Sequence, residues 1–123
     1  MERNEITGQI VDAAMKVHTK LGPGVLESAY EACLVYELRK RGIKAVNQLG
    51  LPIVYDEVVL DVGYRIDLLV EDEIIVELKA VEQILPIHKA QLLSYLKLSE
   101  KSVGLLINFH VEQLKQGIVR MAN

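Results

Sequence analysis

The sequence predicts one α/β domain over residues 1–123, in which helices flank a mixed β-sheet. Two observations predict this class. Apolar residues recur at helical spacing before residue 42 and again after Pro86, whereas β-branched residues and turn signals dominate the segment between them. A chain of 123 residues that is 50% hydrophobic also has enough apolar surface for one core without a covalent cross-link.

The first two elements are predicted to be amphipathic helices. The first is expected to end before Gly22, with an inward face made of Ile6, Ile10, Ala13, Ala14, Val17 and Leu21. The second is expected over residues 25–41, with an inward face made of Leu26, Tyr30, Cys33, Leu34 and Leu38.

The rest of the chain is predicted to alternate strands with one helix. Residues 51–60, 63–70 and 74–80 are β-rich and separated by acidic or glycine turns, which predicts a three-stranded meander. Pro86 then opens a helix that runs to about Ser99. Residues 103–109 are nearly all apolar, as expected of a strand buried on both faces, and residues 117–121 are predicted to form a short edge strand.

The charge balance weighs against a plain DNA-binding module. With 17 acidic and 14 basic side chains, the net charge of −3 is unlike that of a protein that coats nucleic acid nonspecifically. It is compatible with a metal-dependent enzyme, whose clustered carboxylates are neutralised by the bound cation. The N-terminus has no basic segment before an apolar run, and no apolar stretch reaches about 18 residues, so we expect a cytoplasmic protein without membrane insertion.

The strands around the acidic turn at residues 71–73 place two carboxylates face to face. Glu77 and Lys79 are two residues apart, so they project from the same side of their strand. A turn at residues 71–73 sets Asp67 opposite Glu77 and leaves only apolar pairs on the other face: Val70–Ile74, Leu68–Val76 and Ile66–Leu78. Opposed like charges destabilise a sheet unless a positive charge lies between them.

Two interpretations of this charged face remain open. In the first, its four charged side chains form diagonal ion pairs on an exposed surface and need no ligand; they are Arg65, Asp67, Glu77 and Lys79. In the second, apolar neighbours on the same side partly cover the carboxylates, which then require strong compensation. A divalent cation with oxygen ligands would supply it, and Lys79 beside the cation would orient or deprotonate the attacking water.

Three motifs resemble those of a known superfamily. Asp67, followed after nine residues by Glu77-Leu78-Lys79, resembles the signature of PD-(D/E)XK nucleases, although Ile66 replaces the proline of that name. The segment Gly24-Val25-Leu26-Glu27-Ser28-Ala29-Tyr30 resembles the motif of the GxxExxY proteins of this superfamily. Gln91 with Tyr95 resembles the Q-x-x-x-Y element of several such nucleases.

The resemblance implies a PD-(D/E)XK nuclease-like core and hydrolysis of nucleic-acid phosphodiester bonds, with DNA favoured over RNA. It implies magnesium, or manganese in its place, held by Asp67, Glu77, the Leu78 carbonyl and Glu27. The implied catalytic residues are Asp67, Glu77, Lys79 and Glu27, and the substrate-binding residues are His88, Gln91 and Tyr95. Two alternatives stay open: an inactive nuclease-fold module for nucleic-acid binding or protein assembly, and a structural homo-oligomer.

Overall fold

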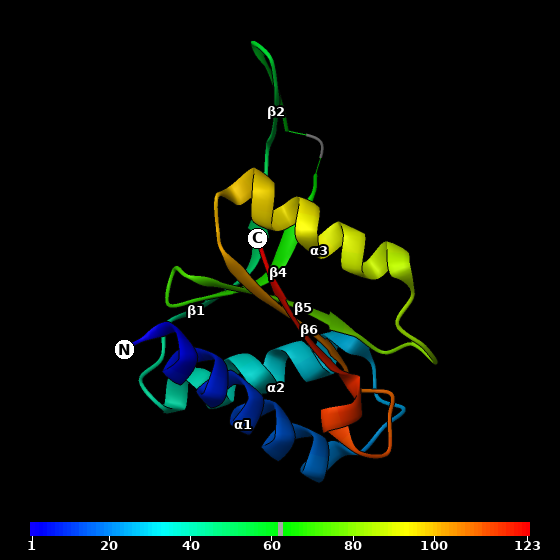
Figure 1. Ribbon diagram of the computed structural model, residues 1–123. Helices are drawn as coiled ribbons and strands as arrows, with labels where there is room; N and C mark the ends of the chain where they lie inside the picture. Colours follow the sequence, from blue (N-terminus) through cyan, green and yellow to red (C-terminus); the bar gives the residue numbers. More distant parts are fainter. Residues whose placement is uncertain (62) are drawn as a thin grey trace.

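The computed structural model, which describes residues 1–61 and 63–123, has three layers: two helices, a β-sheet and a third helix. Helices α1 (Arg3–Leu21) and α2 (Glu27–Lys40) lie on one face of a five-stranded sheet, and α3 (Pro86–Ser99) lies on the other (Figure 1). The α/β class and the mixed sheet flanked by helices are therefore confirmed. No helix in these two described ranges is long and apolar enough to span a membrane.

The predicted helices are confirmed in position, with two errors in their inward faces. Leu21 and Leu26 were expected in the core but are 39% and 76% exposed. Leu26 precedes the first turn of α2, so helical spacing does not turn it inward. Leu21 is the last residue of α1 and lines an open groove between α1 and α2. The other predicted positions are buried, except that Cys33 is half-buried against the core.

The sheet has the strand order β1-β4-β5-β6-β7, formed by Ala45–Gly50, Arg65–Val70, Ile74–Lys79, Val103–Asn108 and Ile118–Ala122. Only β5 and β6 run parallel among these strands, and α3 is the crossover between them. Every residue of β6 is buried, and β7 lies at the sheet edge, as predicted. A short 3-10 helix, η1 (Leu114–Gly117), precedes β7.

The predicted meander is wrong in its first strand. Residues 45–50 supply the strand that pairs with β4, whereas residues 51–60 fold into a separate hairpin of β2 (Ile53–Tyr55) and β3 (Val58–Leu60). Pro52, which lacks an N–H donor, separates β1 from β2. This hairpin extends away from the rest of the molecule (Figure 1). Its β-branched residues therefore predicted strand conformation correctly but not the strand's partner.

Two apolar clusters fill the space on either side of the sheet. The larger lies under α1 and α2 and receives Leu68, Val76 and Leu78 from β4 and β5. The smaller lies under α3 and receives Leu69 and Ile75. Alternate residues of β5 thus face opposite clusters, so Glu77 and Lys79 project from the side that carries Ile75. In β4 the alternation stops at the motif, because Ile66 packs in the smaller cluster beside Leu69.

Candidate active site

The ladder between β4 and β5 stops where the two motif carboxylates begin. Its pairs run from Val70–Ile74 to Leu68–Val76, which confirms the predicted register at this end. Beyond them, the amide of Asp67 donates a hydrogen bond to Oε2 of Glu77 at 2.8 Å. Side chains therefore accept the backbone hydrogen bonds at the point where strand pairing ends.

The carboxylate of Asp67 completes this exchange across the two strands. Its Oδ2 accepts a hydrogen bond from the amide of Leu78 at 2.8 Å, so the ladder does not extend to the predicted pair Ile66–Leu78. On the other side of β4, Gln48 has a φ of +52° and does not pair with Asp67 in the described ladder. The motif aspartate thus sits at a local break in the sheet on both sides.

Each carboxylate has one oxygen that is not used in a hydrogen bond between the two strands. The hydrogen bonds use Oδ2 of Asp67 and Oε2 of Glu77, and neither remaining oxygen has a protein partner within residues 1–61 and 63–123. Nevertheless, no fully buried side-chain oxygen in these ranges lacks a hydrogen-bond partner, so both remaining oxygens reach solvent-accessible space. Two such oxygens are the hard donors that Mg²⁺ or Mn²⁺ prefers, and they fit a divalent cation.

The Leu78 carbonyl is suitably directed to be a third donor. The N–H and C=O of one strand residue point to the same side of the strand, and the Leu78 N–H points toward Asp67. In the part of the chain that the structure describes, no three His, Cys, Asp or Glu side chains lie close enough together to hold a metal ion. The site therefore offers two carboxylates and a backbone oxygen, which suits a cation such as Mg²⁺ that retains several waters.

The two carboxyl groups have raised pKa values. Burial, followed by the negative charge of Asp67, raises the pKa of Glu77 to about 8. Burial likewise raises the pKa of Asp67, and the charges of Glu31 and Glu27 add to the rise, while the hydrogen bond from the Leu78 amide lowers it. At neutral pH and without a cation, burial and the charge of Asp67 therefore favour the protonated form of Glu77.

The ion-pair interpretation is not what the structure shows. Among the described residues, no salt bridge joins Asp67 or Glu77 to Arg65 or Lys79. Arg65 is exposed and donates instead to the backbone carbonyl of Gln48 at 3.2 Å. The acidic pair is therefore not compensated by a direct ion pair.

The Gly24–Tyr30 segment places Glu27 beside this pair. Gly24 adopts a φ of +89°, which favours glycine, in the turn that precedes α2. The buried Tyr30 hydroxyl donates to the Gly22 carbonyl and accepts from the Val25 amide, so it fixes this turn. Glu27 is the first residue of α2, is exposed, and lines an open pocket together with Asp67.

Glu31 is an acidic residue that the sequence interpretation missed. It lies one turn after Glu27 on α2, lines the same pocket, and accepts hydrogen bonds from the side chains of Gln48 and Asn47. Its spacing of four residues from Glu27 was the available signal, because such residues share one helix face.

The end of β5 is tied to β6, which fixes the place of Lys79. The Lys79 carbonyl accepts a hydrogen bond from the Phe109 amide at 2.9 Å. The side chain of Asn108 bonds both backbone groups of Val81, accepting from its N–H at 3.1 Å and donating to its carbonyl at 2.8 Å. Lys79 is half-buried at the end of this anchored strand.

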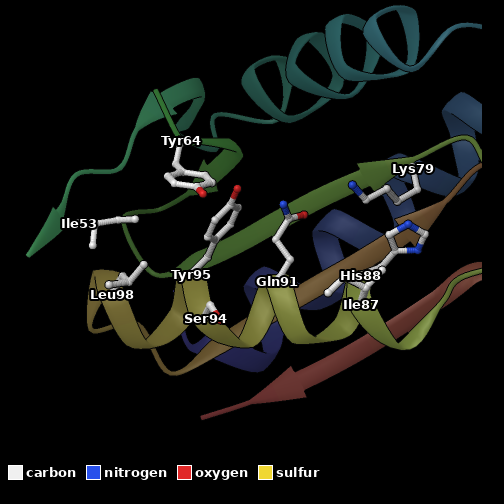
Figure 2. Close-up of a pocket in the computed structure, with 9 residues that line it drawn as sticks. All are labelled: Ile53, Tyr64, Lys79, Ile87, His88, Gln91, Ser94, Tyr95 and Leu98. Carbon is white, nitrogen blue, oxygen red and sulfur yellow. The ribbon is translucent and has the colours of Figure 1, made fainter. Parts of the chain in front are cut away.

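Lys79 lines a pocket of about 540 Å³ that runs along α3. The predicted substrate residues His88, Gln91 and Tyr95 line the same pocket. Figure 2 shows Lys79 and His88 at one end, Gln91 between, and Tyr95 beside Tyr64 at the other end. Tyr64, which the sequence interpretation missed, makes an edge-on contact with Tyr95 with ring centroids 6.5 Å apart.

The Tyr95 hydroxyl lies within the influence of the acidic pair. Burial raises its pKa, and the charges of Glu77 and Asp67 raise it further. The Tyr95 hydroxyl is therefore close enough to the acidic pair to respond to its charge, whereas Asp67 itself lines a second pocket with Glu27 and Glu31 of α2.

Comparison with known proteins identifies the superfamily. The family model described as the PD-(D/E)XK nuclease superfamily matches residues 4–121. No curated protein and no solved structure matches the chain. The narrower resemblance to GxxExxY proteins stays a prediction. Since the match covers all five strands of the sheet and all three α-helices apart from one residue of α1 and one of β7, the chain belongs to the PD-(D/E)XK nuclease superfamily.

Proposed function

We propose that the chain is a metal-dependent nuclease that hydrolyses phosphodiester bonds of nucleic acid, with DNA preferred to RNA. Membership of the superfamily supports a nuclease-type function in general. The observation that carries the metal dependence is the pair of opposed carboxylates, each with a free oxygen that reaches solvent. Magnesium is the proposed cation and manganese its substitute.

The proposed ligands are Asp67, Glu77 and the Leu78 carbonyl, with Glu27 acting directly or through water. The geometry supports this division because Glu77 and Asp67 are held by hydrogen bonds to the strands, whereas Glu27 is exposed at the start of α2. When bound, the cation would lower the pKa of a bound water and offset negative charge on the phosphate.

Lys79 is the positively charged side chain of the proposed site. Its ammonium group, held at the end of β5, is proposed to orient the attacking water and to stabilise the negative charge that develops on the phosphate. His88, Gln91 and Tyr95 are proposed to position the substrate, since they line the pocket that begins at Lys79.

An inactive nuclease-fold module is the second candidate. The observation that favours it is that no group of three acidic, histidine or cysteine side chains within residues 1–61 and 63–123 is close enough to hold a metal. Assembly of the chain into a homo-oligomer and its cytoplasmic location stay predictions from the sequence.

A nuclease panel separates the two candidates. Single-stranded and duplex DNA and RNA are incubated with the protein in Mg²⁺, in Mn²⁺ and in chelator. We expect cleavage only with a metal, and we expect Lys79→Ala to lower the rate by at least about 100-fold while magnesium binding is retained. Lys97→Ala, which removes an exposed lysine of α3 away from the pocket, is the matched control. Wild-type protein that cleaves nothing, or Lys79→Ala protein that cleaves normally, would contradict the proposal.

A further inference from the structure

The pocket next to Lys79 is larger than a phosphate contact requires. Its volume of about 540 Å³ falls in the range of small-molecule sites, and it extends from β5 along α3 to the β2–β3 hairpin. A phosphate group bound at Lys79 would occupy only one end. The remaining volume is therefore available to another part of the substrate.

The far end of the pocket has the chemistry that holds a flat aromatic ring. Tyr64 and Tyr95 stand edge-on to each other, and Tyr64 is 45% exposed, so part of its ring is free for contact. Apolar side chains from two elements complete this part of the wall: Ile53 of β2 and Leu98 of α3 (Figure 2). Such a surface favours stacking and apolar contact with a planar heterocycle.

Polar groups along α3 can read the edge of such a ring. Gln91 offers two donors and an acceptor, and Ser94 offers a hydroxyl one turn away on the same wall. Figure 2 shows the Gln91 amide extending into the space between Lys79 and Tyr95. A nucleobase, with donors and acceptors around its rim, matches this combination better than a sugar or an aliphatic group does.

The near end of the pocket suits the phosphate of the same nucleotide. Lys79 provides a cation, and His88 lies beside it. The Nδ1 atom of His88 accepts a hydrogen bond from the Leu85 amide at 2.9 Å, so the neutral ring carries its proton on Nε2. His88 is therefore a hydrogen-bond donor through Nε2, and the pocket changes from anion-binding to base-binding along its length.

The charge of the molecule argues for this local mode of binding. A net charge of −3, together with three exposed acidic residues on and beside the hairpin, gives little counterion release along an extended duplex; they are Asp56, Glu57 and Asp61. Stacking of unpaired bases supplies affinity without a large basic surface. A base inside a duplex is already stacked and cannot enter a pocket without leaving its partner.

We propose that this pocket binds an unpaired nucleobase adjacent to the phosphate at Lys79, which makes single-stranded or frayed nucleic acid the substrate class. The inference rests on the proposed nuclease function, because that function places the scissile phosphate near Lys79. The base-binding step itself requires neither cleavage nor metal.

Equilibrium binding in chelator tests the inference without turnover. A short oligonucleotide carrying 2-aminopurine is titrated with the protein, as a single strand and as a blunt duplex of the same sequence. We expect the single strand to bind at least about tenfold more tightly and its 2-aminopurine fluorescence to be quenched by stacking. Equal affinity for the two forms would overturn the inference.

Tyrosine variants locate the binding in the pocket. Tyr64→Ala should weaken single-strand binding about tenfold, and Tyr64→Phe should retain it, because the phenyl ring preserves stacking. Tyr36→Ala, which removes a 64% exposed tyrosine of α2 outside the pocket, is the matched control and should bind normally. If Tyr64→Ala does not fold, Leu98→Ala on α3 tests the same wall and should also weaken binding.

The outcomes separate this inference from the nuclease proposal. Cleavage by the wild-type protein, with unchanged binding by folded Tyr64→Ala and Leu98→Ala proteins, would overturn the base pocket and leave the nuclease function standing. Binding that depends on Tyr64, in a protein that cleaves no nucleic acid in Mg²⁺ or Mn²⁺, would support the base pocket and contradict the nuclease function.

Discussion

The two ends of the β4–β5 hairpin differ in their side chains and in their hydrogen bonding. Near the turn, Val70–Ile74 and Leu68–Val76 are apolar pairs in a regular backbone ladder. At the other end, the carboxylates of Asp67 and Glu77 accept hydrogen bonds from backbone amides of the opposite strand. The apolar end supplies folding energy, and the acidic end offsets part of it, because Glu77 is buried and Asp67 is partly buried beside it.

The destabilising acidic pair persists in this small domain because the apolar pairs fix the register of the two strands. A shift of one residue in β5 would move Glu77 into the cluster packed against α1 and α2, so the apolar pairs keep Glu77 out of that cluster. The acidic end therefore depends on the apolar end for its geometry. Substitutions at the two ends should have opposite effects on stability.

The largest expected effect comes from the apolar end. Leu68→Ala should lower the free energy of unfolding by about 2–5 kcal/mol, because Leu68 is fully buried in the larger cluster. Denaturant titration in chelator measures this loss in the free energy of unfolding. Leu60→Ala on the exposed hairpin makes the same chemical change and should cost less than about 0.5 kcal/mol. Equal losses in the two variants would show that the β4–β5 ladder is not the stabilising part.

At the acidic end, Glu77→Gln should stabilise the protein in chelator, increasingly so as the pH rises. The pKa of Glu77 is about 8 in the folded protein and 4.5 as its ordinary value. Between these values the folded state binds more protons, so wild-type stability falls as the pH rises from about 4.5 through 8. The variant lacks this titration.

The expected gain for Glu77→Gln is small at pH 5 and about 0.5–2 kcal/mol at pH 9, because relief of like-charge repulsion is complete only when both carboxylates ionise. Thermal or denaturant unfolding across this pH range provides the measurement. A variant that is less stable than wild type at pH 9 would favour the ion-pair interpretation, in which removal of Glu77 leaves cations without partners.

The smallest expected effect is that of Glu27→Gln. Glu27 is exposed at the first turn of α2, and glutamine has a similar helix propensity, so the fold should be retained within about 0.5 kcal/mol. Magnesium affinity should fall by a few fold, as measured by calorimetry. Glu5→Gln on α1 is the control for loss of one exposed negative charge. Unfolding of the Glu27→Gln protein would assign this residue a structural role.

Local patterns in the sequence predicted the helices and the register near the turn. The i, i+3, i+4 spacing of α1 and the alternation around residues 71–73 depend on neighbours in the chain, so both could be inferred. The partner of residues 53–60 could not be, because strand propensity does not specify which strand pairs with which.

The sequence predicted the residues of the candidate site that belong to recognisable motifs, but not the others. Asp67, Glu77 and Lys79 follow from spacing along two strands, and the structure links Asp67 to the Glu77–Lys79 strand through the hydrogen bonds of Asp67 with Glu77 and Leu78. Glu31 lies near the site because α2 lines the same pocket as Asp67, and Tyr64 lies near it because it directly precedes β4. Tertiary contacts of this kind produce no periodic pattern in the sequence, so they could not be predicted from it.

Magnesium titration of thermal unfolding tests most directly whether the acidic pair is a cation site. The wild-type protein at pH 7.5 should melt at a rising temperature as magnesium reaches millimolar concentrations, because a ligand that binds only the folded state stabilises it by mass action. The Glu77→Gln protein should gain little. A wild-type protein whose melting temperature ignores magnesium and manganese, beside a Glu77→Gln protein that is less stable in chelator, would contradict the account.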